Sequence, residues 1–202
     1  MGPHASANFL TLYHRALNHR GVYEDTDFPR IIYLGLPLTE WGVTGALDKD
    51  AVASQVKDGL RWLKDAGAEL IAIPCNSVHE FHGEASATLG VPVLNIVTES
   101  LRITRRKPLG VLCSAQARAA GLYERCGSAI MYLRLQGRID AMIGAVIHGN
   151  APSIDCLIDE LRAVGAGTVV LGCTELSVCR WTPAPDLVDS TRALAGALAA
   201  LT

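Results

Sequence analysis

Cys75 and Cys173 are the residues of this chain whose type and surroundings best fit chemistry. Each follows a short apolar run typical of a buried strand, and each is followed by small or polar residues. Ligands of open α/β sheets bind at the carboxyl ends of strands. Backbone N–H groups at a helix N-terminus there favour a thiolate, and they also bind an anion such as a carboxylate.

Two thiols that face each other across a cleft could invert a carbon atom that carries one acidic hydrogen. One thiolate would remove the proton from one face, and the other thiol would return a proton to the opposite face. An unperturbed thiol pKa of about 8.5 suits both roles. Because the α-carbon of an amino acid is weakly acidic, hydrogen-bond donors must stabilise its carboxylate as charge builds up. Polar groups at these strand ends are supplied by Asn76, Ser77, Ser114, Thr174 and Glu175.

The two cysteines also belong to an internal repeat. Segments 63–77 and 161–175 align without a gap, and each contains a helix end, a Gly-Ala turn, an apolar strand and then the cysteine. The identical pairs are Leu63 and Leu161, Gly67 and Gly165, Ala68 and Ala166, and Cys75 and Cys173. Gly-Ala turns are common in α/β units, but the shared cysteine position favours a true structural repeat.

Short apolar runs alternate with helical patterns along the chain. Strands are predicted over residues 30–36, 69–74, 91–97, 108–113, 129–133, 168–172 and 186–188. Helices are predicted over 5–19, 48–66, 115–125, 137–148, 153–164 and 190–201, with Asp48 and Ser153 as N-caps and Gly67 and Gly165 after two helix ends. This alternation predicts an α/β fold with parallel sheets.

The repeat predicts two similar lobes, each a parallel sheet flanked by helices, related by a pseudo-two-fold axis with the active-site cleft between them. We expect an N-terminal lobe over residues 1–98 and a C-terminal lobe over 99–202, with the last helix packing back on the first lobe. The second lobe opens with a strand before its first helix. The first lobe begins almost directly with a helix near Ala5, so its first strand is expected to be missing.

Four short segments carry recognisable motifs. Residues 75–79 read Cys-Asn-Ser-Val-His, and residues 172–175 read Gly-Cys-Thr-Glu. The chain opens with Met-Gly-Pro-His-Ala-Ser, and residues 189–191 read Asp-Ser-Thr. These segments resemble the two cysteine motifs, the end of the N-terminal loop and the start of the last helix of the aspartate/glutamate racemase family. The resemblance covers essentially the whole chain, with one cysteine motif in each lobe.

The resemblance implies a cofactor-independent amino-acid racemase, an isomerase without pyridoxal phosphate or metal, usually a homodimer. By that match the catalytic bases are Cys75 and Cys173, and the substrate is bound by Asn76, Ser77, Ser114, Thr174 and Glu175. Members of the family often carry an Arg after the second strand for a distal carboxylate, but residues 37–45 contain neither Arg nor Lys. Racemisation is therefore a firmer expectation than aspartate or glutamate as the substrate.

Composition and charge argue against several other classes. The 202 residues are 50% hydrophobic and 19% charged, which is typical of a folded α/β protein and not of a disordered chain. A formal net charge of −2 gives no basic surface for nucleic acid, and no apolar run reaches the roughly 18–20 residues of a membrane span. Six cysteines without a C-x-x-C pair, and no signal-peptide pattern, predict reduced thiols in a cytoplasmic protein.

Other interpretations of the same residues stay open. Cys75, His79 and His82 form a C-x3-H-x2-H pattern that could bind zinc, but no fourth ligand is evident nearby and His79 fits better as a partner of the Cys75 loop. A related decarboxylase or maleate-type isomerase would also use cysteine chemistry, and a decarboxylase would need one proton-donating cysteine. A two-lobed small-molecule-binding protein without activity would need no facing thiols. The remaining cysteines, Cys113, Cys126, Cys156 and Cys179, are expected to pack as small apolar residues.

Overall fold

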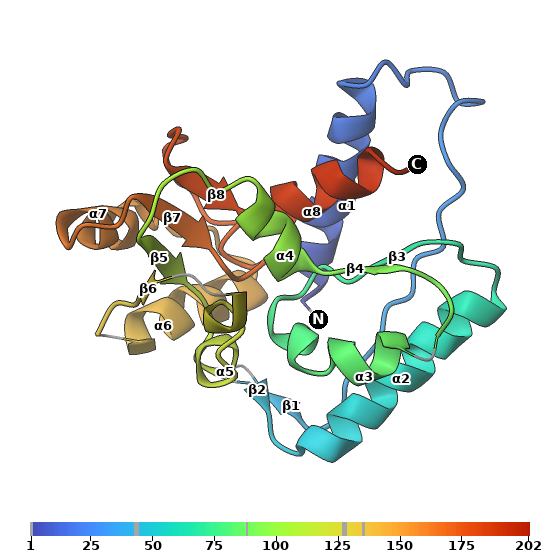
Figure 1. Cartoon of the computed structure of the whole chain (residues 1–202), viewed down its shortest axis with the longest axis horizontal. Coiled ribbons are helices and arrows are strands. Elements are labelled where there is room, and N and C mark those ends of the chain that lie inside the picture. Colours follow the sequence, from blue (N-terminus) through green and yellow to red (C-terminus); the bar gives the residue numbers. More distant parts are fainter. Residues whose placement is uncertain (1, 43–44, 88, 127–128, 135) are drawn as a thin grey trace.

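The computed structural model of the protein describes residues 2–42, 45–87, 89–126, 129–134 and 136–202 (Figure 1). Its helices flank two groups of parallel strands, one in each lobe, and a short antiparallel hairpin precedes the long helix of the first lobe. The predicted α/β class with parallel sheets in two lobes is confirmed.

The second lobe contains a parallel sheet of four strands in the order β6-β5-β7-β8. The strands are β5 (Leu109–Leu112), β6 (Ile130–Met131), β7 (Thr168–Leu171) and β8 (Leu187–Asp189). The helices are α5 (Ala115–Ala119), α6 (Gln136–Ile147), α7 (Asp155–Ala163) and α8 (Ser190–Ala199), with a 3₁₀ turn η2 (Glu124–Cys126). Alternate residues of β7 face opposite sides, so Val169 and Leu171 pack with α6 and α7 whereas Val170 packs with α8.

The first lobe has a smaller sheet, in which β3 (Ile71–Ala72) pairs in parallel with β4 (Val93–Leu94). A hairpin is formed by β1 (Trp41–Gly42) and β2 (Gly45–Ala46). The helices are α1 (Pro3–Asn18), α2 (Lys49–Asp65), α3 (His82–Ala87) and α4 (Ile96–Arg102), with a 3₁₀ turn η1 (Ser77–Glu80). The apolar face of α2 buries Val52, Val56 and Leu60 in one cluster with Ile71 and Ile73.

The last helix joins the two lobes. Helix α8 packs against both α1 and α4, which is the return to the first lobe that the sequence predicts (Figure 1). The expected boundary between residues 98 and 99 falls inside α4, which leads from the small sheet toward the larger one. Within the described ranges, no helix has both the length and the apolar character that crossing a membrane requires.

The two turns of the internal repeat have the same backbone geometry. Gly67 and Gly165 follow α2 and α7 with φ values of 94° and 99°, where glycine is the residue without a steric penalty. In each turn the alanine after the glycine donates its N–H to the leucine five residues earlier, at 3.0 Å in both copies. Asp48 caps α2 as predicted, since its side chain accepts hydrogen bonds from the N–H groups of Asp50 and Ala51.

The predicted strand over residues 30–36 is wrong. This segment has no regular secondary structure, and Ile31 and Tyr33 are exposed at 42% and 59%. A strand needs a neighbour for its backbone N–H and C=O groups, and in the part of the chain that the structure describes none pairs with this segment. The apolar run favours a strand, but a strand forms only where a neighbouring strand can pair with it.

One strand end, one helix end and one helix cap also differ from the predictions. The strand predicted over 91–97 ends at Leu94, because the Asn95 side chain accepts from two following N–H groups and starts α4. The helix predicted over 115–125 ends at Ala119, just before Gly121 turns with φ of 60°. Ser153 is not the N-cap of α7, because it forms a parallel bridge with Arg180 and the helix begins after the next residue.

Candidate active site

Cys75 and Cys173 occupy equivalent places in the two lobes, each just beyond the carboxyl end of a parallel strand, β3 or β7. Cys173 is buried, with 7% of its surface exposed, and Cys75 is partly buried. The two sulfur atoms lie near enough for the charge of a Cys75 thiolate to raise the pKa of Cys173. The structure thus brings together the two cysteines that the sequence singled out.

Some surrounding groups raise the pKa values of the two thiols and others lower them. Burial, followed by the negative charge of Glu175, raises the pKa of the Cys75 thiol to about 11, while the backbone N–H groups of Val78 and Ser77 pull it down. Burial, Glu175 and the charge of Cys75 raise the pKa of Cys173 as well. Near neutral pH both groups are therefore thiols, and a thiolate formed in this site is a strong base.

Glu175 is the charged group shared by both thiols. Its Oε2 atom accepts a hydrogen bond from Cys173 Sγ at 3.1 Å and another from Thr174 Oγ1 at 3.2 Å. Its other carboxylate oxygen lies against the start of α1, because a Cβ atom added to Gly2 would stand 2.6 Å from Oε1. The N-terminal end of α1 therefore forms part of the wall beside Cys173.

Ser77 and Ser114 also come together, although they lie on different lobes. Their Oγ atoms are 2.7 Å apart and both side chains are buried. Ser114 also caps α5 by accepting a hydrogen bond from the N–H of Ala117. The two hydroxyls follow β3 and β5, so they lie at the carboxyl edges of the two sheets near the cysteines.

Both polar atoms of the Asn76 side chain form hydrogen bonds within the protein. Its Oδ1 accepts a hydrogen bond from the Tyr123 hydroxyl at 2.8 Å, and its Nδ2 donates to Ser190 Oγ at 3.0 Å. All three residues are buried, and Tyr123 and Ser190 belong to the second lobe. This chain of hydrogen bonds holds the residue after Cys75 against the other lobe. Sequence reasoning missed Tyr123, because nothing in its local pattern separates it from an ordinary helix residue.

Gln116 is a second residue that sequence reasoning missed. It is buried, its Oε1 accepts a hydrogen bond from the N–H of Ala46 at 3.0 Å, and its Nε2 donates to Glu80. Glu80 also forms an ion pair with Lys49 at the start of α2. This cluster fastens the β1–β2 hairpin of the first lobe to α5 of the second.

His79 is held by backbone groups beside Cys75. Its Nδ1 lies 2.7 Å from the carbonyl oxygen of Cys75, so Nδ1 is the donor, and Nε2 lies 3.3 Å from the carbonyl oxygen of Leu94 and 3.4 Å from the backbone nitrogen of Ile96. The ring therefore orients the Cys75 loop, as the sequence predicted. The side chain of His82 lies outside the described residues. Among the side chains that are described, no His, Cys, Asp and Glu residues gather into a group of three that could hold a metal ion.

The other cysteines divide into two kinds. Cys113 and Cys179 are buried, as expected, and burial raises the pKa of Cys113 to about 12. The expectation that Cys156 packs in the interior is wrong, because it lies exposed on α7 with its sulfur 3.7 Å from Arg138 Nη2. The side chain of Cys126 lies outside the described residues.

Fold and site define a two-lobed α/β protein in which each lobe places a cysteine at the end of one parallel strand. A sequence profile of the Asp/Glu/Hydantoin racemase family matches residues 1–198 of this chain. The chain therefore belongs to the Asp/Glu/Hydantoin racemase family, and the resemblance seen in the cysteine motifs is confirmed.

Two characterised relatives are similar in sequence. The broad specificity amino-acid racemase RacX of Bacillus subtilis is 29% identical over 103 residues, which cover 50% of this chain and 45% of the relative. The glutamate racemase of Aquifex aeolicus is 23% identical over 195 residues, which cover 89% of this chain and 74% of the relative. The match to RacX thus spans less than half of that protein.

Two solved structures share the fold. The aspartate racemase of Picrophilus torridus superposes with a TM-score of 0.76 at 20% identity, covering 98% of this chain and 89% of the other. An aspartate racemase homologue from Pyrococcus horikoshii superposes with a TM-score of 0.72 at 21% identity, covering 98% of this chain and 95% of the other. At these identities the comparison establishes the two-lobed fold.

Proposed function

We propose that this protein is an amino-acid racemase that inverts the α-carbon by proton transfer between Cys75 and Cys173. The observation that carries the proposal is the placement of two thiols, Cys173 buried and Cys75 partly buried, at equivalent strand ends, near enough to interact through their charges. Membership of a racemase family supports the reaction class. The proposed substrate class is an amino acid, with no particular side chain assigned.

The reaction needs one thiolate and one thiol. The thiolate takes the α-hydrogen as a proton, so the C–H bond breaks, an S–H bond forms and the electron pair stays on carbon. The opposite thiol then gives its proton to the other face and becomes the thiolate, which leaves the enzyme ready for the reverse turnover. A Cys75 pKa of about 11 makes its thiolate a stronger base than an ordinary one.

Glu175 and the hydroxyl groups complete the proposed site. Glu175 accepts a hydrogen bond from Cys173, so its carboxylate is placed to receive the thiol proton when a thiolate must form. Ser77, Ser114 and Thr174 supply the hydroxyls that bind the α-carboxylate and stabilise the charge that builds on it. Asn76 acts chiefly through its hydrogen bonds to the second lobe, which fix the loop that carries Cys75.

We propose that the reaction needs no organic cofactor or metal, because two thiols and a carboxylate account for every proton that moves. The chemistry needs reduced cysteines, and the described cysteines are free thiols, which supports a cytoplasmic location. The family resemblance further supports a homodimer. Size-exclusion chromatography with light scattering measures the molar mass in solution and tests that assembly directly.

Deuterium exchange tests the reaction. The protein is incubated in D₂O with L-aspartate, L-glutamate and a panel of neutral amino acids, and the α-proton signal is followed by NMR. We expect the signal to disappear for at least one amino acid while its D-enantiomer accumulates. Exchange with none of them, combined with thermal stabilisation by an amino acid, would favour a binding protein; release of CO₂ from a substituted malonate or isomerisation of maleate would favour the related enzymes.

Single substitutions test the roles of the thiols. Cys75→Ser and Cys173→Ser should each lower racemisation by roughly 100-fold or more, because a serine hydroxyl is a poor base. Cys156→Ser is the matched control, since Cys156 is exposed on α7 away from both strand ends. Equal rates in all three variants would contradict the assignment.

A further inference from the structure

The junction between β8 and α8, residues 189–191, carries an Asp-Ser-Thr motif that no step of the proposed proton transfer uses. Asp189 pairs with Leu171 in the register of β8 and β7, and Cys173 follows Leu171 by two residues. Asp189 and Ser190 are both buried, with 5% and 0% of their surface exposed. Buried polar side chains need hydrogen-bond partners, so the partners of these two residues show which segments the junction holds.

Asp189 accepts hydrogen bonds on both carboxylate oxygens. Its Oδ2 accepts from Ser177 Oγ at 2.7 Å, and its Oδ1 accepts from the N–H of Thr191 at 2.9 Å. Burial raises the pKa of Asp189, whereas the hydrogen bonds from Ser177 and Thr191 favour the charged form. Hydrogen bonds to a charged acceptor are stronger than those to a neutral one. Asp189 therefore holds Ser177, which lies in the turn that follows Cys173.

Ser177 also connects this turn to the first lobe. Its Oγ accepts a hydrogen bond from Asn8 Nδ2 of α1 at 2.9 Å. The turn is tight, because the N–H of Leu176 donates to the carbonyl oxygen of Cys173 at 3.0 Å, and it also carries Glu175. Fixing Ser177 therefore fixes the thiol and the carboxylate that accepts its hydrogen bond.

Ser190 contacts the loop of the other thiol. Its Oγ accepts a hydrogen bond from Asn76 Nδ2 at 3.0 Å, and Asn76 follows Cys75 directly in the chain. Asp189 and Ser190 are neighbours joined by one planar peptide bond. Two adjacent side chains of one strand-to-helix junction therefore hold both cysteine loops, one loop from each lobe.

We propose that Asp189 and Ser190 are positioning residues that together set the separation of the Cys75 and Cys173 thiols, an inference that rests on the proposed function. Proton transfer on both faces of one carbon needs each sulfur within about 3–3.5 Å of that carbon. A misplacement of about 1 Å can slow such a reaction by about 100-fold. A junction that holds both loops keeps the two sulfurs in a fixed relation to the substrate between them.

The test changes the partners of the junction, because Asp189 also caps α8 and its removal would loosen that helix. Ser177→Ala removes the donor to Asp189, and Ser190→Ala removes the acceptor of Asn76 Nδ2. Each variant is treated with iodoacetamide at mildly alkaline pH. Mass spectrometry of the peptides then gives the alkylation rate of each cysteine separately.

We expect a crossed pattern of alkylation rates. In Ser177→Ala the alkylation of Cys173 should become about tenfold faster and that of Cys75 should change less, because a loosened turn loses the burial that raises the thiol pKa. In Ser190→Ala the larger increase, about fivefold, should fall on Cys75, since Tyr123 still holds the loop. The kcat of racemisation should fall about tenfold in both variants.

Two further variants separate positioning from a general loss of stability. Ser177→Thr keeps the hydroxyl and should restore the alkylation rates and kcat of the unchanged protein to within about twofold. Ser100→Ala is the matched control, because Ser100 is fully buried but its Oγ donates to the carbonyl oxygen of Ile96 within α4. It should leave both thiols and kcat unchanged.

Equal acceleration of both thiols in each serine variant would show general loosening and would overturn the proposal. Unchanged alkylation and kcat in Ser177→Ala and Ser190→Ala would overturn it as well. The alkylation pattern needs no turnover, so it decides the positioning role independently of racemisation. Absence of racemisation in the unchanged protein would contradict the proposed function alone.

Discussion

The strands β3 and β7 end at the two cysteines and come from the same repeated unit, yet they differ in the structure. Strand β7 has four residues, all buried, with β5 on one side and β8 on the other. Strand β3 has two residues and, in the part of the chain that the structure describes, it pairs with β4 alone. The turns that lead into the two strands nevertheless share one hydrogen-bond pattern.

This difference shows which features of the repeat have a local cause and which depend on tertiary contacts. The Gly-Ala turn forms in both lobes because glycine tolerates the positive φ and the turn bonds lie within a few residues. Strand length depends on partners, because each backbone N–H and C=O in a sheet needs a neighbouring strand. Equivalent sequences therefore place equivalent cysteines but give them sheets of unequal size.

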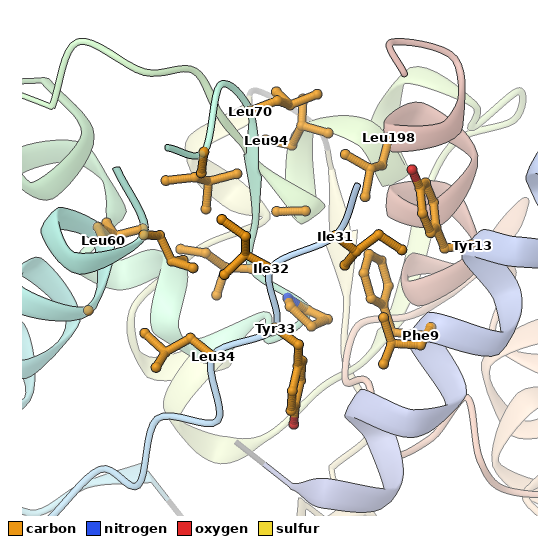
Figure 2. A pocket seen from close by; sticks show the side chains of 18 of the residues that line it. Phe9, Tyr13, Ile31, Ile32, Tyr33, Leu34, Leu60, Leu70, Leu94 and Leu198 are labelled. Atoms are coloured by element: carbon orange, nitrogen blue, oxygen red, sulfur yellow. The ribbon is translucent and has the colours of Figure 1, made fainter. Parts of the chain in front are cut away.

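The largest effect on stability is expected in the better-packed strand. Leu171→Ala in β7 should lower the free energy of unfolding by about 4 kcal/mol, because the fully buried site leaves a cavity that cannot fill. Ile71→Ala in β3 should cost about 2 kcal/mol, because Ile71 lines an open apolar cavity of about 950 Å³ (Figure 2) and neighbouring side chains there can move into the space that the substitution leaves. Urea unfolding of both variants measures the difference, and equal losses would contradict unequal support of the two strands.

A smaller loss of stability is expected when the hydrogen bond that fastens the Cys75 loop to the second lobe is removed. Tyr123→Phe removes the donor to Asn76 Oδ1 and leaves a buried acceptor without that bond, which should cost about 1–2 kcal/mol. Racemisation should fall together with stability, because the residue after Cys75 is no longer fixed. Tyr33→Phe is the control, since that side chain is exposed at 59%. A stable Tyr123→Phe variant with full activity would show that the bond has no positioning role.

The two turns should respond alike. Gly67→Ala and Gly165→Ala each place a Cβ atom at a positive φ, although no atom lies within 4 Å of either new methyl group. Each should destabilise the protein by about 1 kcal/mol through backbone strain. Thermal unfolding of the two variants measures this, and clearly unequal losses would argue against equivalent turns.

The smallest effect on folding is expected for Glu175→Gln, which should change stability by less than about 1 kcal/mol. Its effects are on catalysis: racemisation should slow, because the carboxylate that receives the Cys173 proton is lost, and the pH dependence should change. After burial, the charge of Glu175 is the second cause that raises the pKa of both thiols, so its loss lowers both pKa values. The rise of kcat/KM with pH, which follows formation of the thiolate, should therefore move to lower pH. A rise that stays at the pH of the unchanged protein would contradict this role.

The pKa values of the two thiols should respond differently to Glu175→Gln, because only one of the thiols contacts Glu175 directly. Glu175 accepts a hydrogen bond from Cys173, whereas its effect on Cys75 is through charge alone. The pKa of Cys173 should therefore fall further than that of Cys75. Thiol alkylation followed across pH in Cys75→Ser and Cys173→Ser backgrounds measures each sulfur separately.

Several features of the site could be read from the sequence. The shared position of Cys75 and Cys173 came from the repeat, and the cap at Asp48 came from local residue types. Tyr123 and Gln116 could not be found in this way. Their importance lies in contacts with residues 47 and 36 positions away, Asn76 and Glu80, which no local pattern encodes.

The sequence by itself determined the family, the α/β alternation, the turns at Gly67 and Gly165 and the placing of a cysteine after one strand in each lobe. These features depend on residue type and short-range bonds. Only the tertiary structure decided that residues 30–36 form no strand, that Asn76 is held by the second lobe, and that both thiols lie near Glu175. The reason is physical: strand pairing, burial and thiol pKa values depend on neighbours that are brought together from distant parts of the chain.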